Sequence, residues 1–491
     1  MSRSKRARSA PKGAVSSPPR PVDDFPPKYK KLINRFYEPL ILLRVLGQTR
    51  GGHSTVQEHD TRSLQCTRRR FLACLAYVAS NAKRKKISEF LAKLLERLRV
   101  IATSTADGDG EDEIATKCID FATPRIKKEV GLLRSRIAQY HKRSAARATE
   151  QDMMLLGWLG YFQNPEALVS ICQFAYDERR STWMKELEQR SRSPRYKSSD
   201  DASHVMFNYI RHYVGRLADH IRKPKHLIQH CQQLIFLFDN WTVKGVEAMQ
   251  ATPRPEHSPQ TSLPNILKRM LPKDDPKLPE YEGALTVMDR GHHISDGLRE
   301  YWSDPTFQPK VHAEIQILEQ FYNNGLAFED NDPYIACSKP ACFCCHLYFR
   351  HHPLKCVEAD SHQKVYHNWG PPMINTKDEK EFMRQRDILN EMVKDIRNDA
   401  LNQIIQRRGS LAWHADSVTG ITESVLAERE QADELDSVDG SAPSYNPDSD
   451  ELFDMPEIDS EAVSFCSDAD DPESDSDGGV ALDITELSVS Q

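Results

Sequence analysis

The spacing of apolar residues predicts helices over most of the first 249 residues. Leu, Ile, Val and Phe recur every three or four positions, the period of one face of an α-helix. The clearest stripes lie at 33–43, 71–78 and 87–98. Further helical segments are expected at 126–141, 153–162, 167–189 and 205–238. We therefore expect a helix-rich region over residues 27–249.

The pattern changes after residue 249. Residues 250–262 contain three prolines, and proline lacks the backbone N–H that a helix needs, so this stretch predicts a linker. Beyond it, short and partly β-branched runs alternate with helical periods. Strands are expected at 284–288, 333–336, 356–357 and 364–366, and helices at 311–322, 342–350 and 379–406. This alternation predicts an α/β layer domain with a trailing helix over residues 263–410.

The two ends of the chain differ from its body. The 491 residues carry a formal charge of −6 and are 39% hydrophobic. Residues 431–491 contain 19 acidic residues and no Lys or Arg, so the preceding 430 residues carry a charge of +13. The first twenty residues hold six basic residues and no acidic one. Polar segments with few apolar residues bury too little surface to fold, which predicts a disordered basic arm (1–26) and a disordered acidic tail (423–491).

Composition also restricts the location of the chain and its surface chemistry. No apolar run reaches the roughly 18 residues of a membrane helix, and the N-terminus lacks the apolar core of a secretory signal. We expect a cytoplasmic or nuclear protein that is neither secreted nor membrane-bound. Residues 68–70 are all arginine and lie on a predicted helix. They indicate either a solvated helix face or a surface that follows the phosphates of a nucleic acid.

Cysteine spacing gives the first indication of chemistry. Five of the eleven cysteines fall within twenty residues, at positions 337, 342, 344, 345 and 356. In a reducing compartment such clustering favours metal binding or catalysis over disulfides. Cys342 and Cys345 are three residues apart, so both thiolates can lie on one side of a first helical turn. With His312 as a third ligand, a Zn²⁺ ion keeps its fourth position open, as in catalytic sites.

Glu314 suits a role other than metal binding. It lies two positions after His312, about 200° around a regular helix, so both side chains reach one ion only if His312 precedes the regular helix. A carboxylate beside the ion can take and return the proton of a metal-bound water. The alternative is a closed structural zinc site with a fourth protein ligand drawn from Cys337, Cys344 and His346. In such a closed site, Glu314 would have no chemical role.

His-Ala-Glu at 312–314 followed by Cys-x-x-Cys at 342–345 resembles the zinc-dependent cytidine-deaminase-like superfamily. More narrowly, three motifs resemble the nucleic acid/nucleotide deaminase family that is widespread in fungi. They are HAEIQILEQFY from position 312, YIACSKPACFCCHLYF from 334 and SHQKVYHNWGPP from 361. The resemblance covers about residues 280–375. It departs from the wider superfamily at Pro340, which Ala341 separates from the first cysteine of the pair.

The resemblance implies a three-layer α/β/α domain that follows the helical region and binds Zn²⁺. It implies His312, Cys342 and Cys345 as metal ligands and Glu314 as the catalytic proton shuttle. Four further residues match the family's motifs and are expected to line or buttress the pocket, namely Lys339, His362, Lys364 and Trp369. We expect His351 and His352 to be exposed at a helix end.

The implied reaction is hydrolytic deamination of a nucleobase in a nucleotide or nucleic acid. Zinc-bound hydroxide attacks C4 of cytosine or C6 of adenine, and Glu314 protonates the ring nitrogen and then the leaving amine. The motifs fit either base, free or in a polymer. The alternative is a catalytically inactive zinc scaffold that binds protein partners through the helical region or the acidic tail. The intact Glu314 favours the enzyme.

Overall fold

A computed structural model describes most of the chain between its two ends. The described residues are 25–55, 63–80, 84–103, 110–144, 148–164, 167–192, 203–304 and 307–409, together with Leu411 and His414. Residues 1–24 of the predicted basic arm and the whole predicted acidic tail lie outside the described residues.

The chain forms two compact units, each assembled from segments that are far apart in the sequence. Unit 1 comprises residues 1–47, 248–312 and 366–409, and unit 2 comprises 48–247, 313–365 and 410–491. These units are defined by contacts, whereas a domain is a part of the chain that can fold alone. The predicted domain boundaries at residues 26, 249 and 262 therefore stay predictions.

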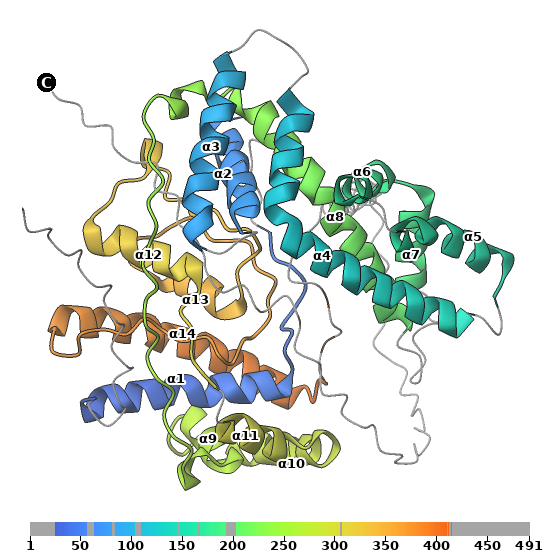
Figure 1. Ribbon diagram of the computed structural model, residues 1–491. Helices are drawn as coiled ribbons and strands as arrows, with labels where there is room; N and C mark the ends of the chain where they lie inside the picture. Colours follow the sequence, from blue (N-terminus) through green and yellow to red (C-terminus); the bar gives the residue numbers. More distant parts are fainter. Residues whose placement is uncertain are drawn as a thin grey trace, which may run out of the picture. The chain divides into compact units, whose positions relative to one another are not determined.

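Unit 1 is built around two long helices. Helix α1 (Pro27–Leu46) lies lengthwise beside α14 (Glu379–Ile405) and also contacts α9 (Leu263–Met270) and α11 (Ile294–Ser303) (Figure 1). Helix α10 (Leu278–His292) packs against α9, α11 and α14, and a short 3₁₀ turn, η5 (Pro259–Thr261), precedes α9. A buried network joins three of the segments, because the Tyr29 hydroxyl donates to Gln385 Oε1 (2.7 Å) and lies 2.8 Å from Thr252 Oγ1.

Unit 2 is a helical bundle around α8 (Ser203–Cys231), so the predicted helix-rich region is confirmed. Helices α2 (Leu64–Ala79), α3 (Arg84–Thr103), α4 (Gly110–Ser144), α6 (Leu168–Glu178) and α7 (Thr182–Arg192) pack against α8. The remaining elements of this unit are α5 (Glu150–Leu159), η2 (Gly160–Gln163), η4 (Ile235–Phe238), α12 (Ala313–Asn324), η6 (Glu329–Asn331) and α13 (Phe343–His351). No helix in the described parts of the chain is both long and apolar enough to cross a bilayer.

The predicted α/β layers are not seen. The described residues contain isolated β-bridges and no regular strand. The strand expected at 284–288 is wrong, because these residues lie inside α10. Ala284, Leu285 and Met288 are buried while Val287 is 52% exposed, which is the spacing of a helix face and not of alternating strand positions. The β-branched residues in this run favoured a strand, but packing of the helix face decided the outcome.

The other expected strands lie in segments that form backbone hydrogen bonds with other segments but no regular strand among the described residues. Residues 361–365 run antiparallel to 48–54, with Ser361 N donating to Ser54 O (2.9 Å) and Val365 N to Gln48 O (2.7 Å). On the other side, Ser361 forms a parallel bridge with Ala341. Val357 N donates to Pro333 O (2.9 Å). The segment after α1 thus pairs directly with the segment that carries His362 and Lys364.

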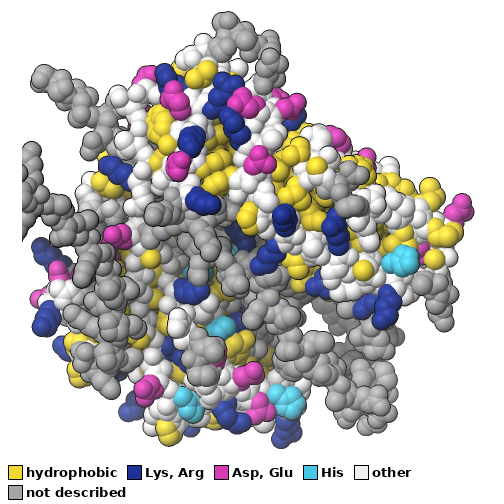
Figure 2. Space-filling model, in the orientation of Figure 1, with side chains coloured by type: hydrophobic (Ala, Val, Ile, Leu, Met, Phe, Trp, Pro, Cys, Tyr) yellow, Lys and Arg dark blue, Asp and Glu magenta, His cyan; other side chains and the backbone are white. Residues whose placement is uncertain are grey.

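Two of the three arginines at 68–70 form ion pairs with acidic residues. Arg68 is 4% exposed and pairs with Asp330, and Arg69 forms a bidentate contact with Asp332 (3.1 and 2.6 Å). These pairs tie α2 to the segment that precedes the cysteine motif. On α3 and α4, basic residues pair with acidic neighbours, and the two kinds of side chain are interspersed at the top of Figure 2. The paired residues on α3 and α4 fit a solvated helix face, whereas Arg68 is too buried to belong to either kind of surface.

Candidate metal centre

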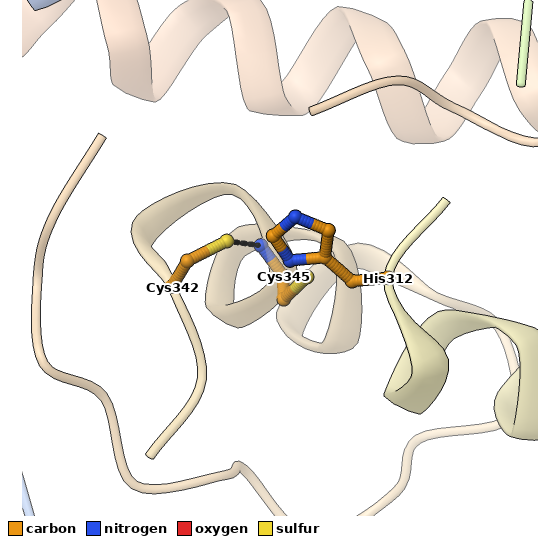
Figure 3. Close-up of side chains that lie close together, drawn as sticks. All are labelled: His312, Cys342 and Cys345. Atoms are coloured by element: carbon orange, nitrogen blue, oxygen red, sulfur yellow. Dashed lines mark hydrogen bonds between the residues drawn. The ribbon is translucent and has the colours of Figure 1, made fainter. Parts of the chain in front are cut away.

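Three side chains converge in the way that the cysteine and histidine spacing predicted. The ligand atoms of His312, Cys342 and Cys345 all lie within 4.8 Å of one another (Figure 3). Cys342 is 2% exposed, Cys345 is fully buried, and His312 is partly exposed. A tetrahedral zinc ion separates such ligand atoms by about 3.5–4 Å, so small side-chain movements close the site. Among the described residues no other group of three meets the same criterion.

His312 owes its orientation to its place just before a helix. Helix α12 begins at Ala313, so His312 lies outside the regular turn that carries Glu314. This removes the 200° separation that a continuous helix imposes. Two residues earlier the backbone is held in extended form, because Lys310 N donates to Asn368 O (2.8 Å) and Gly370 N donates to Lys310 O (2.9 Å).

The pairing beside Lys310 requires a glycine. A Cβ atom on Gly370 would lie 2.7 Å from Pro309 Cβ and 3.0 Å from Ala251 Cβ, closer than such contacts allow. The neighbouring Trp369 is fully buried and packs on Phe36, with ring centroids 5.4 Å apart. Trp369, which we expected to line or buttress the pocket, therefore belongs to the core of unit 1.

The two cysteines lie at the start of α13. Cys342 is the N-cap residue, and its sulfur accepts a hydrogen bond from Cys345 N (3.4 Å; Figure 3). A helix N-terminus carries partial positive charge and favours thiolate over thiol. The loop is held from behind by backbone bonds, since Phe343 N donates to Lys364 O (3.0 Å) and Ala341 N to Asp360 O (2.6 Å).

His362 and Lys364 lie behind this loop. His362 N and Ser361 Oγ both donate to Ala341 O (3.1 and 2.9 Å), and Lys364 N donates to His362 Nδ1 (3.2 Å). His362 is 4% exposed and Lys364 is fully buried. These hydrogen bonds support the loop that positions Cys342. Lys339 lies three residues before Cys342 and is partly exposed.

Burial disfavours the thiolate form of the cysteines in and beside the cluster. Burial raises the pKa of the Cys345 thiol well above its usual value, and hydrogen bonding and charge from Cys342 and Glu314 raise it further. Burial raises the pKa of Cys337 in the same way, with Glu314 and Asp360 adding to the effect. A divalent ion reverses this repulsion and favours the deprotonated thiols. Two sulfurs and one imidazole form a donor set that suits Zn²⁺.

The candidates for a fourth protein ligand lie elsewhere. Among the described residues, the converging group contains neither Cys337 nor Cys344 nor His346. Both ring nitrogens of His346 are already engaged, Nδ1 with Ala359 O (3.2 Å) and Nε2 with Arg350 Nη2 (2.9 Å). Glu314 is outside the group too, yet its carboxylate hydrogen-bonds with Cys345. Three converging ligand atoms with a carboxylate beside Cys345 would leave one position of a tetrahedral ion for water.

A buried polar cluster joins α12 to α13 and was missed from the sequence. Glu319 is 2% exposed and accepts a hydrogen bond from the Tyr348 hydroxyl (2.6 Å). His352 Nε2 lies 3.3 Å from the same carboxylate oxygen, while His352 Nδ1 accepts from Leu354 N (3.2 Å). We expected His352 to be exposed, and this is wrong because His352 is fully buried. His351, which we also expected to be exposed, is half-buried. Glu319 lies four residues after the buried Ile315, on the apolar face of α12. This position was the sequence signal that Glu319 is buried.

Replacing Tyr348 by Phe tests whether this cluster holds the two helices together. The change removes the short bond to Glu319 and leaves a buried carboxylate with one donor fewer. Hydrogen bonds to charged groups contribute about 1.5–3 kcal/mol, so we expect the free energy of unfolding to fall by that amount. Urea denaturation measures it, with Tyr161→Phe at a partly exposed position as the matched control. Equal, small changes in the free energy of unfolding of both variants would show that the cluster contributes nothing to stability.

Comparison with known proteins agrees with the predicted class. Residues 311–373 match the OTT_1508-like deaminase family. This segment contains His312, Glu314, Cys342 and Cys345. The similarity to a deaminase family is thus confirmed for this part of the chain. No curated protein and no solved structure matches the chain.

Proposed function

We propose that this protein is a zinc-dependent hydrolase that deaminates a nucleobase, either in a free nucleotide or in a nucleic acid. The observation that carries the proposal is the convergence of His312, Cys342 and Cys345, with the Glu314 carboxylate beside Cys345, inside a deaminase-like segment. Its motifs resemble the nucleic acid/nucleotide deaminases that are widespread in fungi, and we place the chain closest to that type.

The three converging residues would hold the metal. When bound, the zinc ion supplies Lewis-acid chemistry that lowers the pKa of a water molecule toward neutral. Glu314 would accept a first proton from this water and give it to the ring nitrogen of the base. It would then take the second proton from the added oxygen and give it to the leaving amine. The N-terminus of α13 favours the thiolate form of Cys342, and the backbone bonds to residues 360–364 hold its loop.

The proposed reaction class is hydrolytic deamination, which uses water as the nucleophile and one residue as the proton shuttle. Water adds at the ring carbon that bears the exocyclic amine, the carbon–nitrogen bond breaks, and the products are a carbonyl and ammonia. C4 of cytosine and C6 of adenine are the two carbons that fit. In addition to this reaction, the helical region or the acidic tail would bind protein partners.

A substrate screen tests the proposal directly. The full-length, zinc-loaded protein is incubated with cytidine, adenosine, their monophosphates, single-stranded DNA and RNA, and both ammonia and the converted base are quantified. We expect ammonia in equal amount to the converted base from at least one substrate. Chelation should abolish this activity and added Zn²⁺ should restore it. No ammonia from any substrate at full zinc occupancy would reject the enzyme and favour the scaffold.

A further inference from the structure

Unit 1 contains a hollow with unusual charge, built from residues outside the deaminase-like segment. It has a volume of about 740 Å³ and lies where α1, α14 and the connection between α9 and α10 meet. This volume falls within the range of about 300–1,000 Å³ that small-molecule sites occupy. Its charged lining consists of Arg35, Lys277, Lys394, Arg397, Asp275 and Glu391. Basic side chains therefore outnumber acidic ones by two.

The acidic side chains of the hollow already have partners. Glu391 pairs with Lys394 on the same helix (2.9 Å), and Asp275 Oδ1 accepts a hydrogen bond from the backbone N of Lys277 (2.9 Å). The nearby Glu38 is engaged by both Nε and Nη2 of Arg269 (2.8 and 2.9 Å). The excess positive charge therefore rests on Arg35 and Arg397.

The like charges of Arg35 and Arg397 repel one another, and neither side chain forms an ion pair with another described residue. Burial lowers the pKa of Arg397, the charge of Arg35 lowers it further, and Glu38 only partly opposes this. Arg397 Nε is buried and finds no hydrogen-bond acceptor among the described residues. A buried donor without an acceptor is unfavourable, and two nearby like charges add to that cost. An anion in the hollow would reduce the repulsion between the two charges.

We propose that this hollow binds a phosphate-bearing small molecule, with the phosphate between Arg35 and Arg397. Guanidinium groups present planar pairs of N–H donors that match phosphate oxygens. Leu271, Tyr281 and Leu401 also line the hollow and provide an apolar surface for an attached organic group. The site is separate in sequence from the candidate metal centre, and the proposal does not depend on deaminase activity.

Calorimetric titration of the full-length protein at low salt tests the site with two probes. Inorganic pyrophosphate supplies the phosphate alone, and AMP supplies a phosphate with an organic group. We expect at least one probe to bind with one site per chain, and binding to weaken as salt is raised. Tighter binding of AMP would assign the apolar lining to the organic group, whereas tighter binding of pyrophosphate would assign the site to phosphate alone.

Two variants and one control test whether the probes bind in this hollow. Arg35→Gln alters an exposed side chain and Arg397→Gln a half-buried one, and each should weaken binding by at least tenfold. Arg35→Gln should also leave the thermal midpoint unchanged or raised, since it removes repulsion. Arg386→Gln, on the same α14 but paired with Asp387, should bind as the parent does. Absence of binding in the parent, or equal affinity in all variants, would overturn the proposal.

Discussion

Replacing Glu314 by Gln is expected to reduce deamination by about 10²–10⁴-fold, the range that general acid–base catalysis contributes. Glutamine keeps the size of the side chain and its hydrogen-bonding oxygen but cannot accept a proton from water. Because Glu314 lies outside the converging ligand group, the zinc content should stay at the parent level. The rate of ammonia release and the zinc stoichiometry are measured on the same preparation, with the best substrate from the screen.

The matched control for this variant is Glu329→Gln, the same chemical change in a partly exposed position of the deaminase-like segment. It should keep both zinc and activity. If Glu314→Gln retained full activity, the proton shuttle would be another group. If it lost its zinc, Glu314 would be a ligand, and the open metal position inferred from the structure would be wrong.

Replacing Cys345 by Ala is expected to remove zinc from the protein. Cys345 supplies one of three ligand atoms and is fully buried, so no solvent-exposed group replaces it without a rearrangement. Loss of an outer partner of a ligand alone lowers metal affinity about 10–100-fold, and loss of a ligand should lower it by more than ~100-fold. Elemental analysis after dialysis and competition with a chromophoric chelator measure this effect.

Cys344 provides a closely matched control. It adjoins Cys345, is equally buried and has the same size, but it is not among the converging residues. Cys344→Ala should therefore carry a similar packing cost and keep its zinc. The reverse result, with zinc lost in Cys344→Ala and kept in Cys345→Ala, would show that the ligand set is assigned to the wrong cysteine. Equal loss in both variants would indicate unfolding, which circular dichroism detects.

The cysteine pair of the candidate metal centre was predictable because its motif is short and its geometry is local. Cys342 and Cys345 are three residues apart, and a helix that begins between them places both sulfurs on one side. The start of α12 directly after His312 was likewise required by the spacing to Glu314. Only the approach of the histidine to the cysteine pair depended on the fold, and the family resemblance supplied that expectation.

Fold class was harder to predict than the site. The run at 284–288 contains β-branched residues and lies in a region of mixed patterns, yet it forms the middle of α10. Short apolar runs do not distinguish a strand from a buried helix segment by period alone. The segments at 333–336 and 364–366 form backbone hydrogen bonds with other segments, but pairing with partners up to three hundred residues away determines whether such segments become strands.

The sequence by itself predicted the helical stripes of the first 249 residues and the three side chains that converge at the candidate metal centre. The tertiary structure alone decided that Glu319 and His352 are buried together and that Arg68 and Arg69 pair with acidic residues some 260 positions away. The physical reason is that periodicity describes neighbours within a few turns of one helix. Which buried charge meets which partner depends on packing between distant segments, and sequence spacing carries no information about that.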